Sequence, residues 1–200
     1  MADLFAEKAE DWDQRDLVRD LSAAVSASIL EQVALNETMH VMDFGAGTGL
    51  ITSHIHPHVG KITAVDVSEA MLEKLVAKEA LKGKVSALCV DIVETPIDAR
   101  FDLIVSAMAL HHVAETEKAV RRFAEHLKPG ARIALADLDS EDGSFHAEGT
   151  EGVFHSGFDR ADLQALFERC GFQDVRFVTA HTVEKETGSY PVFLVTASRR

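Results

Sequence analysis

Residues 41–51, VMDFGAGTGLI, place three glycines and an alanine between two apolar runs. The run before them, Met39 to Phe44, is typical of a buried strand. After them, Leu50, Ile51 and Ile55 share one face of a predicted helix. A strand that turns into a helix through glycines can adopt positive φ angles and lets a ligand approach the main chain. The stretch therefore predicts a ligand-binding loop.

The spacing of Gly45, Gly47 and Gly49 is G-x-G-x-G, which differs from the G-x-G-x-x-G of dinucleotide-binding loops. The ligand is therefore indicated by residues elsewhere in the chain. Asp43, Asp66 and Asp91 close three successive predicted strands, at the sheet edge where open parallel sheets bind ligands. Asp66 lies 21 positions after Gly45, where a carboxylate can accept hydrogen bonds from both ribose hydroxyls. Together these residues predict a nucleoside-containing ligand.

Apolar strands and amphipathic helices alternate between Met39 and Asp139, a pattern typical of a mostly parallel sheet with helices on both faces. The helix predicted near 115–127 is followed by a clear stop signal, Lys128-Pro129-Gly130. The periodicity predicts strands at 39–44, 61–65, 85–90, 101–106 and 132–138, with helices near 48–56, 68–80 and 115–127.

Both flanks of this core have patterns of their own. An apolar stripe predicts an N-terminal helix over about 14–34, and a last helix has Asp159 at its N-cap and Gly171 just past its end. Two strands then follow as an antiparallel hairpin, at 173–182 and 190–197. We expect one α/β domain with a seven-stranded sheet and an antiparallel last strand. Its segments are 1–37 over the ligand, the core 38–139, a substrate-side loop 140–158 and the C-terminal part 159–200.

Composition narrows the class of protein. The chain has 200 residues, 46% of them apolar, and a formal net charge of −13, which opposes a nucleic-acid partner. No apolar run is long enough to span a bilayer, and the acidic N-terminus does not have the pattern of a signal peptide. The two cysteines, Cys89 and Cys170, both lie in apolar patterns, so we expect both to be buried and the compartment to be the reducing cytoplasm.

Five motifs in order carry a family resemblance: VMDFGAGTGL, ITAVDVSEAML, VSALCVDI, FDLIVSAMALHHV and LKPGARIALAD. In sequence and spacing they resemble the motifs of class I S-adenosylmethionine-dependent methyltransferases of the small-molecule type 11 and type 12 kind, from about Thr38 to Asp139. The resemblance implies a Rossmann-like fold, S-adenosylmethionine as cofactor and methyl transfer to an acceptor. The acidic LFAEKAEDWD, which contains Trp12, looks like the segment that covers the cofactor in such proteins.

The resemblance also implies roles for single residues. Asp43 and the Gly45–Ala46–Gly47 backbone would hold the methionine moiety, and Asp66 the ribose hydroxyls. The adenine would be bordered by Val67, Met71, Asp91 and Ile92, and Ala107 would lie near the methionine end. A cationic sulfonium suits an acidic crevice, and an in-line displacement depends mainly on alignment.

The sequence lacks the residues that other functions of this architecture require. A short-chain dehydrogenase needs Tyr-x-x-x-Lys, but the single tyrosine, Tyr190, has Leu194 in the lysine position. The SAMALHHV segment lacks the carboxylate of an aminopropyltransferase and the Asn-Pro-Pro-Tyr type motif of a DNA methylase, and two buried cysteines would not serve arsenite methylation. A non-catalytic cofactor-binding scaffold for a partner protein stays open, as do oxygen, nitrogen, sulfur and carbon acceptors and the oligomeric state.

Histidines supply the candidate catalytic groups. His54, His56 and His58 cannot share one helical face, so we expect an exposed helix end and no metal site. His111 and His112 follow the fourth strand at the ligand edge, and a pair here resembles many family members.

The segment 140–158 has no regular periodicity and contains three phenylalanines and two histidines. We predict that it forms a wall of the acceptor pocket, with His146 or His155 turned towards the transferred methyl group.

Overall fold

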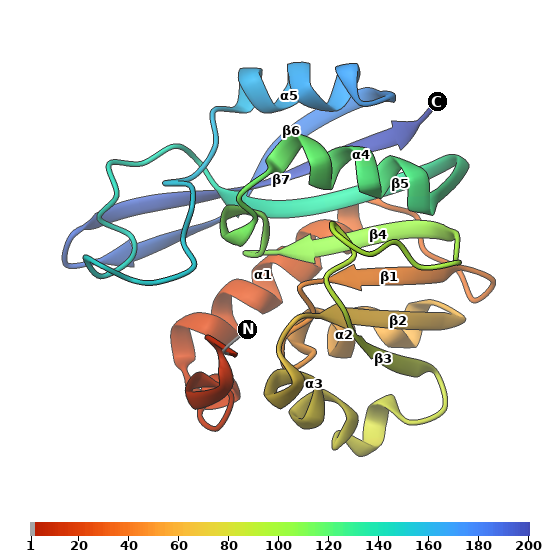
Figure 1. The fold of residues 1–200 in the computed structure, drawn as a ribbon, viewed down its shortest axis with the longest axis horizontal. Helices are drawn as coiled ribbons and strands as arrows, with labels where there is room; N and C mark the ends of the chain where they lie inside the picture. The colour runs from red at the N-terminus through yellow and green to blue at the C-terminus, as the bar shows by residue number, and fades with distance from the viewer. Residues whose placement is uncertain (1–2) are drawn as a thin grey trace.

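The computed structural model describes residues 3–200 and contains a seven-stranded sheet in the order β3-β2-β1-β4-β5-β7-β6 (Figure 1). Strands β1 to β5 are parallel, and β7 is antiparallel to both of its neighbours, so β6 runs in the common direction. This confirms the predicted sheet with an antiparallel last strand. The strands are β1 (His40–Phe44), β2 (Lys61–Asp66), β3 (Val85–Cys89), β4 (Phe101–Ala107), β5 (Leu127–Leu138), β6 (Phe172–Lys185) and β7 (Gly188–Arg199).

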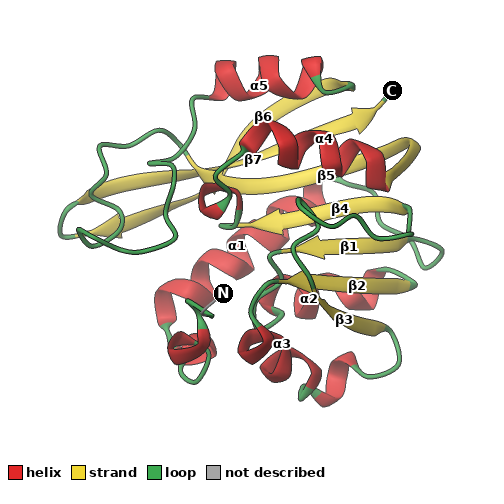
Figure 2. Ribbon diagram, viewed as in Figure 1, coloured by secondary structure: helices red, strands yellow, loops and turns green. Residues whose placement is uncertain are grey.

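Helices cover both faces of the sheet (Figure 2). One face packs against two helices through Phe123 and Phe167, and the opposite face packs against the other three through Ile29, Ile55 and Leu75, all five side chains being buried. The first pair is α4 (Thr116–His126) and α5 (Arg160–Arg169), and the other three are α1 (Asp16–Gln32), α2 (Leu50–Ile55) and α3 (Glu69–Val76). Short 3₁₀ turns complete the set: η1 (Ala6–Lys8), η2 (Trp12–Gln14), η3 (His56–His58), η4 (Glu79–Leu81) and η5 (Leu110–His112).

The order of the strands reverses at β1, which lies between β2 and β4. The chain therefore leaves β1 to one side and β4 to the other, and the carboxyl ends of both strands lie at the edge where open α/β sheets bind ligands. The glycine loop, the end of β2 and the η5 turn all lie at this edge. No helix within residues 3–200 has the length and apolar character needed to cross a membrane.

Several element boundaries differ from the sequence prediction. The helix α4 ends at His126, and Lys128-Pro129-Gly130 lies inside β5, beside a register shift against β4. Tertiary pairing thus extends β5 through a sequence that looks like a turn. The C-terminal hairpin is also longer than predicted, because β6 and β7 are separated only by Glu186 and Thr187. The predicted N-cap at Asp159 is confirmed, since its carboxylate accepts from the backbone N–H groups of Ala161 and Asp162.

The prediction that both cysteines are buried is wrong for Cys89. Cys170 is buried, but Cys89 is exposed at the end of β3. Because β3 is the outermost strand, its apolar run has no neighbouring strand on its free edge. An apolar pattern alone does not distinguish such an edge strand from a central one.

Candidate functional site

The glycine loop leaves β1 and is held against β2 by its own backbone. The N–H groups of Gly45 and Ala46 both donate to the carbonyl of Val65, at 2.9 and 3.1 Å. Gly45, Gly47 and Gly49 have φ angles of 67°, 53° and 81°, which explains the requirement for glycine. A Cβ on Gly47 would have no neighbour within 4 Å, so the space beside this glycine is open to a ligand.

Asp66 ends β2 and links the glycine loop to the start of α3. Its two carboxylate oxygens accept from the backbone N–H groups of Gly47, at 2.7 Å, and Ser68, at 2.9 Å. Each carboxylate oxygen has two lone pairs, so both retain capacity for a further donor such as a hydroxyl. Burial raises the pKa of Asp66 despite these hydrogen bonds. This carboxylate is therefore fixed in place and can still accept a hydrogen bond from a ligand.

Asp43 is a fully buried carboxylate at the end of β1. Its Oδ2 accepts from the Thr52 hydroxyl at 2.5 Å. Burial, and to a smaller extent the charge of Asp66, raises the pKa of Asp43 to about 7. A cationic group bound beside this carboxylate would favour its ionised form, so the site suits a positively charged ligand.

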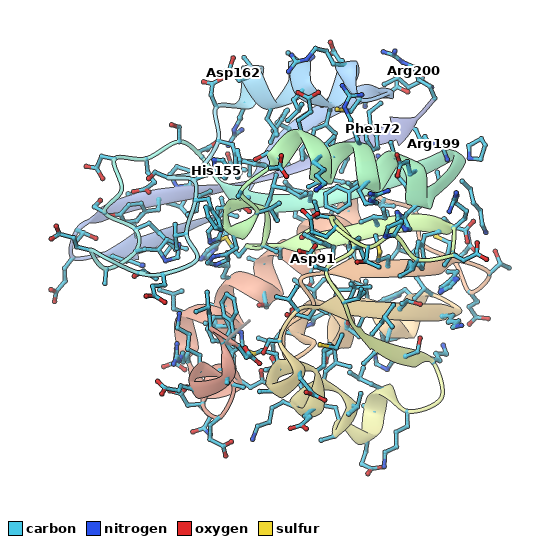
Figure 3. All side chains as sticks on the ribbon, viewed as in Figure 1. Asp91, His155, Asp162, Phe172, Arg199 and Arg200 are labelled. Carbon is cyan, nitrogen blue, oxygen red and sulfur yellow. The ribbon has the colours of Figure 1, made fainter. Side chains whose placement is uncertain are left out.

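The residues predicted beside the adenine gather at the ends of β2 and β3. Val67 is an apolar side chain with 60% of its surface exposed, whereas Met71 and Ile92 are buried. Asp91, labelled in Figure 3, is exposed two residues after the end of β3, and its Oδ1 accepts from the backbone N–H of Val93 at 2.9 Å. Exposed Val67 offers an apolar surface of the kind that a flat aromatic base covers.

The N-terminal segment lies across this edge. Asp3 accepts from the Ser68 hydroxyl at 2.8 Å, and Asp13 accepts from the Thr48 hydroxyl at 2.5 Å. Trp12 is half-buried, with the Arg15 guanidinium 5.2 Å from its ring centroid. The segment that contains Trp12 is therefore attached to both the glycine loop and the α3 N-terminus.

The other half of the edge begins where β4 ends. Ala107 is half-buried, and Met108 follows it with a φ angle of 55°, which a non-glycine residue rarely adopts. The Met108 N–H donates to the Ala136 carbonyl at 2.9 Å, which holds the turn into η5 against β5. Ala109 then approaches the glycine loop so closely that a Cβ on Gly45 would lie 2.4 Å from its own Cβ.

His111 is buried in η5 and paired with Asp137 of β5. Its Nδ1 lies 2.7 Å from Oδ1 of Asp137, and both side chains are essentially inaccessible to solvent. The same carboxylate accepts from the backbone N–H groups of His111 and Leu138, at 3.2 and 2.8 Å. His111 is a candidate from the sequence alone, but Asp137 is not, because an Asp inside a buried strand is noticeable only once its partner is known.

Two further histidines stand beside His111. The ring centroid of His112 is 4.1 Å from that of His111, and the ring centroid of His146 is 5.1 Å from it. Nδ1 of His112 is 2.6 Å from the Gly152 carbonyl, and Nε2 of His146 is 3.3 Å from Nε2 of His111. Burial is the main factor that lowers the pKa of His112 and of His146 to about 4, so both are neutral at physiological pH.

His155 lies elsewhere in the same loop. Its Nε2 is 2.9 Å from the Val113 carbonyl and 3.1 Å from the Thr116 hydroxyl. Figure 3 labels His155. The structure thus brings His111, His112 and His146 together and attaches His155 to the start of α4. Within residues 3–200, no group of three or more His, Cys, Asp or Glu side chains could hold a metal ion.

The loop 140–158 contains no helix and contributes to a groove of about 590 Å³ with the tip of the β6–β7 hairpin. His146 and the half-buried Lys185 line it, and the Lys185 Nζ lies 3.6 Å from the Phe145 ring centroid. Nζ also donates to the Phe145 carbonyl at 2.6 Å. The groove therefore has both an imidazole and an ammonium group in its wall.

Comparison with known proteins supports one family. Residues 42–133 match the model of a methyltransferase domain. An uncharacterized methyltransferase of Geobacillus kaustophilus is 30% identical over 191 residues, which cover 85% of this chain and 87% of that protein. The chain belongs to the S-adenosylmethionine-dependent methyltransferases. Its cofactor is S-adenosylmethionine.

Two further similarities show how much of this chain and of the related proteins is matched. An uncharacterized methyltransferase of Schizosaccharomyces pombe is 28% identical over 157 residues, and the match spans 70% of this chain but only 55% of that protein. A Haloferax volcanii methyltransferase, solved in complex with the Trm112 methyltransferase activator, has a TM-score of 0.83 and 18% identity, with 100% and 99% of the two chains covered. This last similarity shows that the two proteins share one fold over their whole compared length.

Proposed function

We propose that this methyltransferase moves the methyl group of S-adenosylmethionine to a small-molecule acceptor by in-line displacement. The single observation that supports a small acceptor most directly is the open groove lined by His146 and Lys185, because small ligands bind in concave sites with a few polar groups. This groove includes His146, which contacts the buried His111 beside the ligand edge. The acceptor would therefore reach the edge past an imidazole wall.

The residues at the ligand edge would bind the cofactor in the roles that the sequence predicts. The ammonium of the methionine moiety would lie near the Asp43 carboxylate and the Gly45–Gly47 backbone, and the ribose hydroxyls would bind the oxygens of Asp66. Met71 and exposed Val67 would border the adenine, together with Asp91 and Ile92. Ala107 would lie near the methionine end, and the segment of Trp12 would cover the bound cofactor. The bound cofactor supplies an electrophilic methyl group on a cationic sulfur.

The contribution of the protein to this reaction is mainly alignment. Backbone hydrogen bonds fix the glycine loop and Asp66, so the donor site is rigid before the ligand arrives. Holding two reactants in line can provide a large part of the acceleration of a displacement reaction. The neutral His112 and His146 add no positive charge that would oppose a sulfonium nearby.

Thermal denaturation tests the cofactor assignment. S-adenosylmethionine or S-adenosylhomocysteine at 100 times its dissociation constant is expected to stabilise the fold by about 2.7 kcal/mol, whereas nicotinamide dinucleotides at the same concentration should leave the melting temperature unchanged. A shift with the dinucleotides alone would contradict the proposal. Formation of S-adenosylhomocysteine separates an enzyme from a non-catalytic scaffold, since a scaffold would bind the cofactor without turnover.

A further inference from the structure

The buried pair of His111 and Asp137 continues into the groove through His146. Oδ1 of Asp137 lies 2.7 Å from Nδ1 of His111, and Nε2 of His111 lies 3.3 Å from Nε2 of His146. The three side chains come from η5, from the end of β5 and from the loop that follows β5. They form a continuous chain from a carboxylate with no solvent exposure to a half-buried imidazole in the wall of the groove.

The hydrogen bonds define which nitrogen of each ring carries a proton. Asp137 already receives the N–H groups of His111 and Leu138, so its carboxylate acts as an acceptor and Nδ1 of His111 must be the donor. In this Nδ1–H form, His111 has its lone pair on Nε2. The His146 Nε2 must donate to that lone pair, which leaves the lone pair of His146 on Nδ1.

We propose that Asp137 and His111 are positioning residues that hold His146 as the Nε2–H tautomer, so that its Nδ1 accepts the proton of a hydroxyl group on the methyl acceptor. This inference deepens the proposed function and rests on it. It names the acceptor class, an alcohol or a phenol, and it adds Asp137 to the residues on which the reaction depends.

The proton balance of the step is complete. The oxygen of the acceptor forms a bond to the methyl carbon while the carbon–sulfur bond breaks, and the sulfonium becomes the neutral thioether of S-adenosylhomocysteine. The O–H bond breaks and its proton moves to Nδ1 of His146. The Nε2 proton of the resulting imidazolium can then shift to His111, where the Asp137 carboxylate stabilises the positive charge.

The charges around His146 agree with a neutral base. Burial is the largest cause of a His146 pKa lowered to about 4. Repulsion from neighbouring cationic groups lowers this pKa further, first from His111 and His112 in their protonated forms and then from Lys185 and Lys8. The ring is therefore unprotonated near neutral pH and its lone pair is available. A weak base suffices here, because a hydroxyl oxygen becomes strongly acidic as it acquires positive charge during its attack on the methyl group.

An NMR experiment on the full chain with ¹⁵N-labelled histidine tests the tautomers. With S-adenosylhomocysteine bound, the proton of His111 is expected on Nδ1 and that of His146 on Nε2, with the His146 ring neutral at pH 7. His146→Gln assigns the signals of that ring, and the exposed His58 serves as the reference for an unconstrained histidine. A proton on Nδ1 of His146, or an imidazolium at pH 7, would overturn the proposal.

Two matched comparisons complete the test. Phenol in millimolar excess is expected to shift the Nδ1 signal of His146, and anisole, which lacks the hydroxyl proton, is expected to leave it in place. Equal responses, or none, overturn the hydroxyl assignment. In Asp137→Asn, the single His146 tautomer should become a mixture, and an unchanged tautomer overturns the positioning role. Calorimetry on the same samples reports failure of the proposed function separately, as lost binding of S-adenosylhomocysteine.

Discussion

The two halves of the ligand edge are built in different ways. On the cofactor side, Asp66 and the glycines are held by backbone hydrogen bonds between neighbouring strand ends. On the acceptor side, the geometry depends on side chains from distant segments, such as the 2.7 Å contact of His111 with Asp137. The first arrangement follows from local chain conformation and the second from tertiary packing. The residues proposed to bind the cofactor are therefore readable in the sequence, whereas those proposed to face the acceptor have to be seen in three dimensions.

The largest effect is expected at Gly45, where the two halves touch. A Cβ on Gly45 would lie 2.4 Å from the Ala109 Cβ, and the φ of 67° is unfavourable for any side chain. The Gly45→Ala substitution should lower the free energy of unfolding by about 2–5 kcal/mol, from left-handed strain together with overpacking. Urea unfolding measures this change.

Gly47→Ala is the matched control for this prediction. Gly47 has a similar φ of 53°, but a Cβ there would have no neighbour within 4 Å. Its cost should be limited to the strain, about 1–2 kcal/mol. Because the new methyl group would enter the space assigned to the cofactor, S-adenosylhomocysteine affinity should fall more than stability does. Equal destabilisation by the two substitutions would contradict the close contact of the two halves.

Asp66 tests the cofactor half alone. Asp66→Ala would remove the proposed charge-assisted bonds to the ribose hydroxyls, each worth at most about 1.5–3 kcal/mol, so the affinity for S-adenosylhomocysteine should fall more than tenfold. Asp66→Asn, which keeps one oxygen acceptor, should lose less. Calorimetry on folded variants measures both. Unchanged affinity in Asp66→Ala would remove the ribose assignment.

Much of the fold could be predicted from the sequence because its signals are local. The glycines, the strand periodicity and the cap at Asp159 each act within a few residues, and the structure has the predicted seven strands. The exceptions have tertiary causes. The helix α4 ends just before Lys128-Pro129-Gly130 as predicted, but these residues lie within β5, which begins at Leu127 rather than at 132 and pairs with β4 and β7. The exposed Cys89 lies on an edge strand.

The candidate site divides in the same way. Asp43 and Asp66 could be proposed from the sequence because each lies at the end of a strand beside the glycine loop. The partner of His111 could not, because Asp137 is 26 positions away and nothing in its surrounding sequence indicates a contact. Likewise, His146 and His155 are equivalent candidates in sequence, and only the structure separates the ring beside His111 from the ring on Val113.

Asp43 gives the cofactor half a pH dependence. Burial raises its pKa from 3.8 to about 7, so the folded protein binds a proton more tightly than the unfolded chain. The free energy of unfolding should therefore fall as pH rises from about 4 to about 7, and change little above that through this group. A ligand ammonium beside Asp43 favours the carboxylate, so S-adenosylhomocysteine affinity should rise over the same range, by at most about tenfold per pH unit. Asp43→Asn should remove both trends, and a pH series of calorimetric titrations checks this.

The smallest effect is expected at His155, and it distinguishes an anchor of the loop 140–158 from a wall of the acceptor pocket. His155→Ala loses the contacts of Nε2 with the Val113 carbonyl and the Thr116 hydroxyl, so we expect a loss of stability of about 1 kcal/mol and faster proteolysis within 140–158. His155→Gln, whose amide can donate to the same carbonyl, should recover part of this stability.

The affinity for S-adenosylhomocysteine should stay within about twofold of the unmodified chain in His155→Ala, because neither contact of His155 reaches the glycine loop. His146→Ala should give the opposite pattern, with turnover depressed and stability largely kept, since His146 Nε2 contacts the ring of His111. If His155→Ala instead abolished turnover while stability and proteolysis were unchanged, His155 would belong to the acceptor wall and the division of the loop between its two histidines would be wrong.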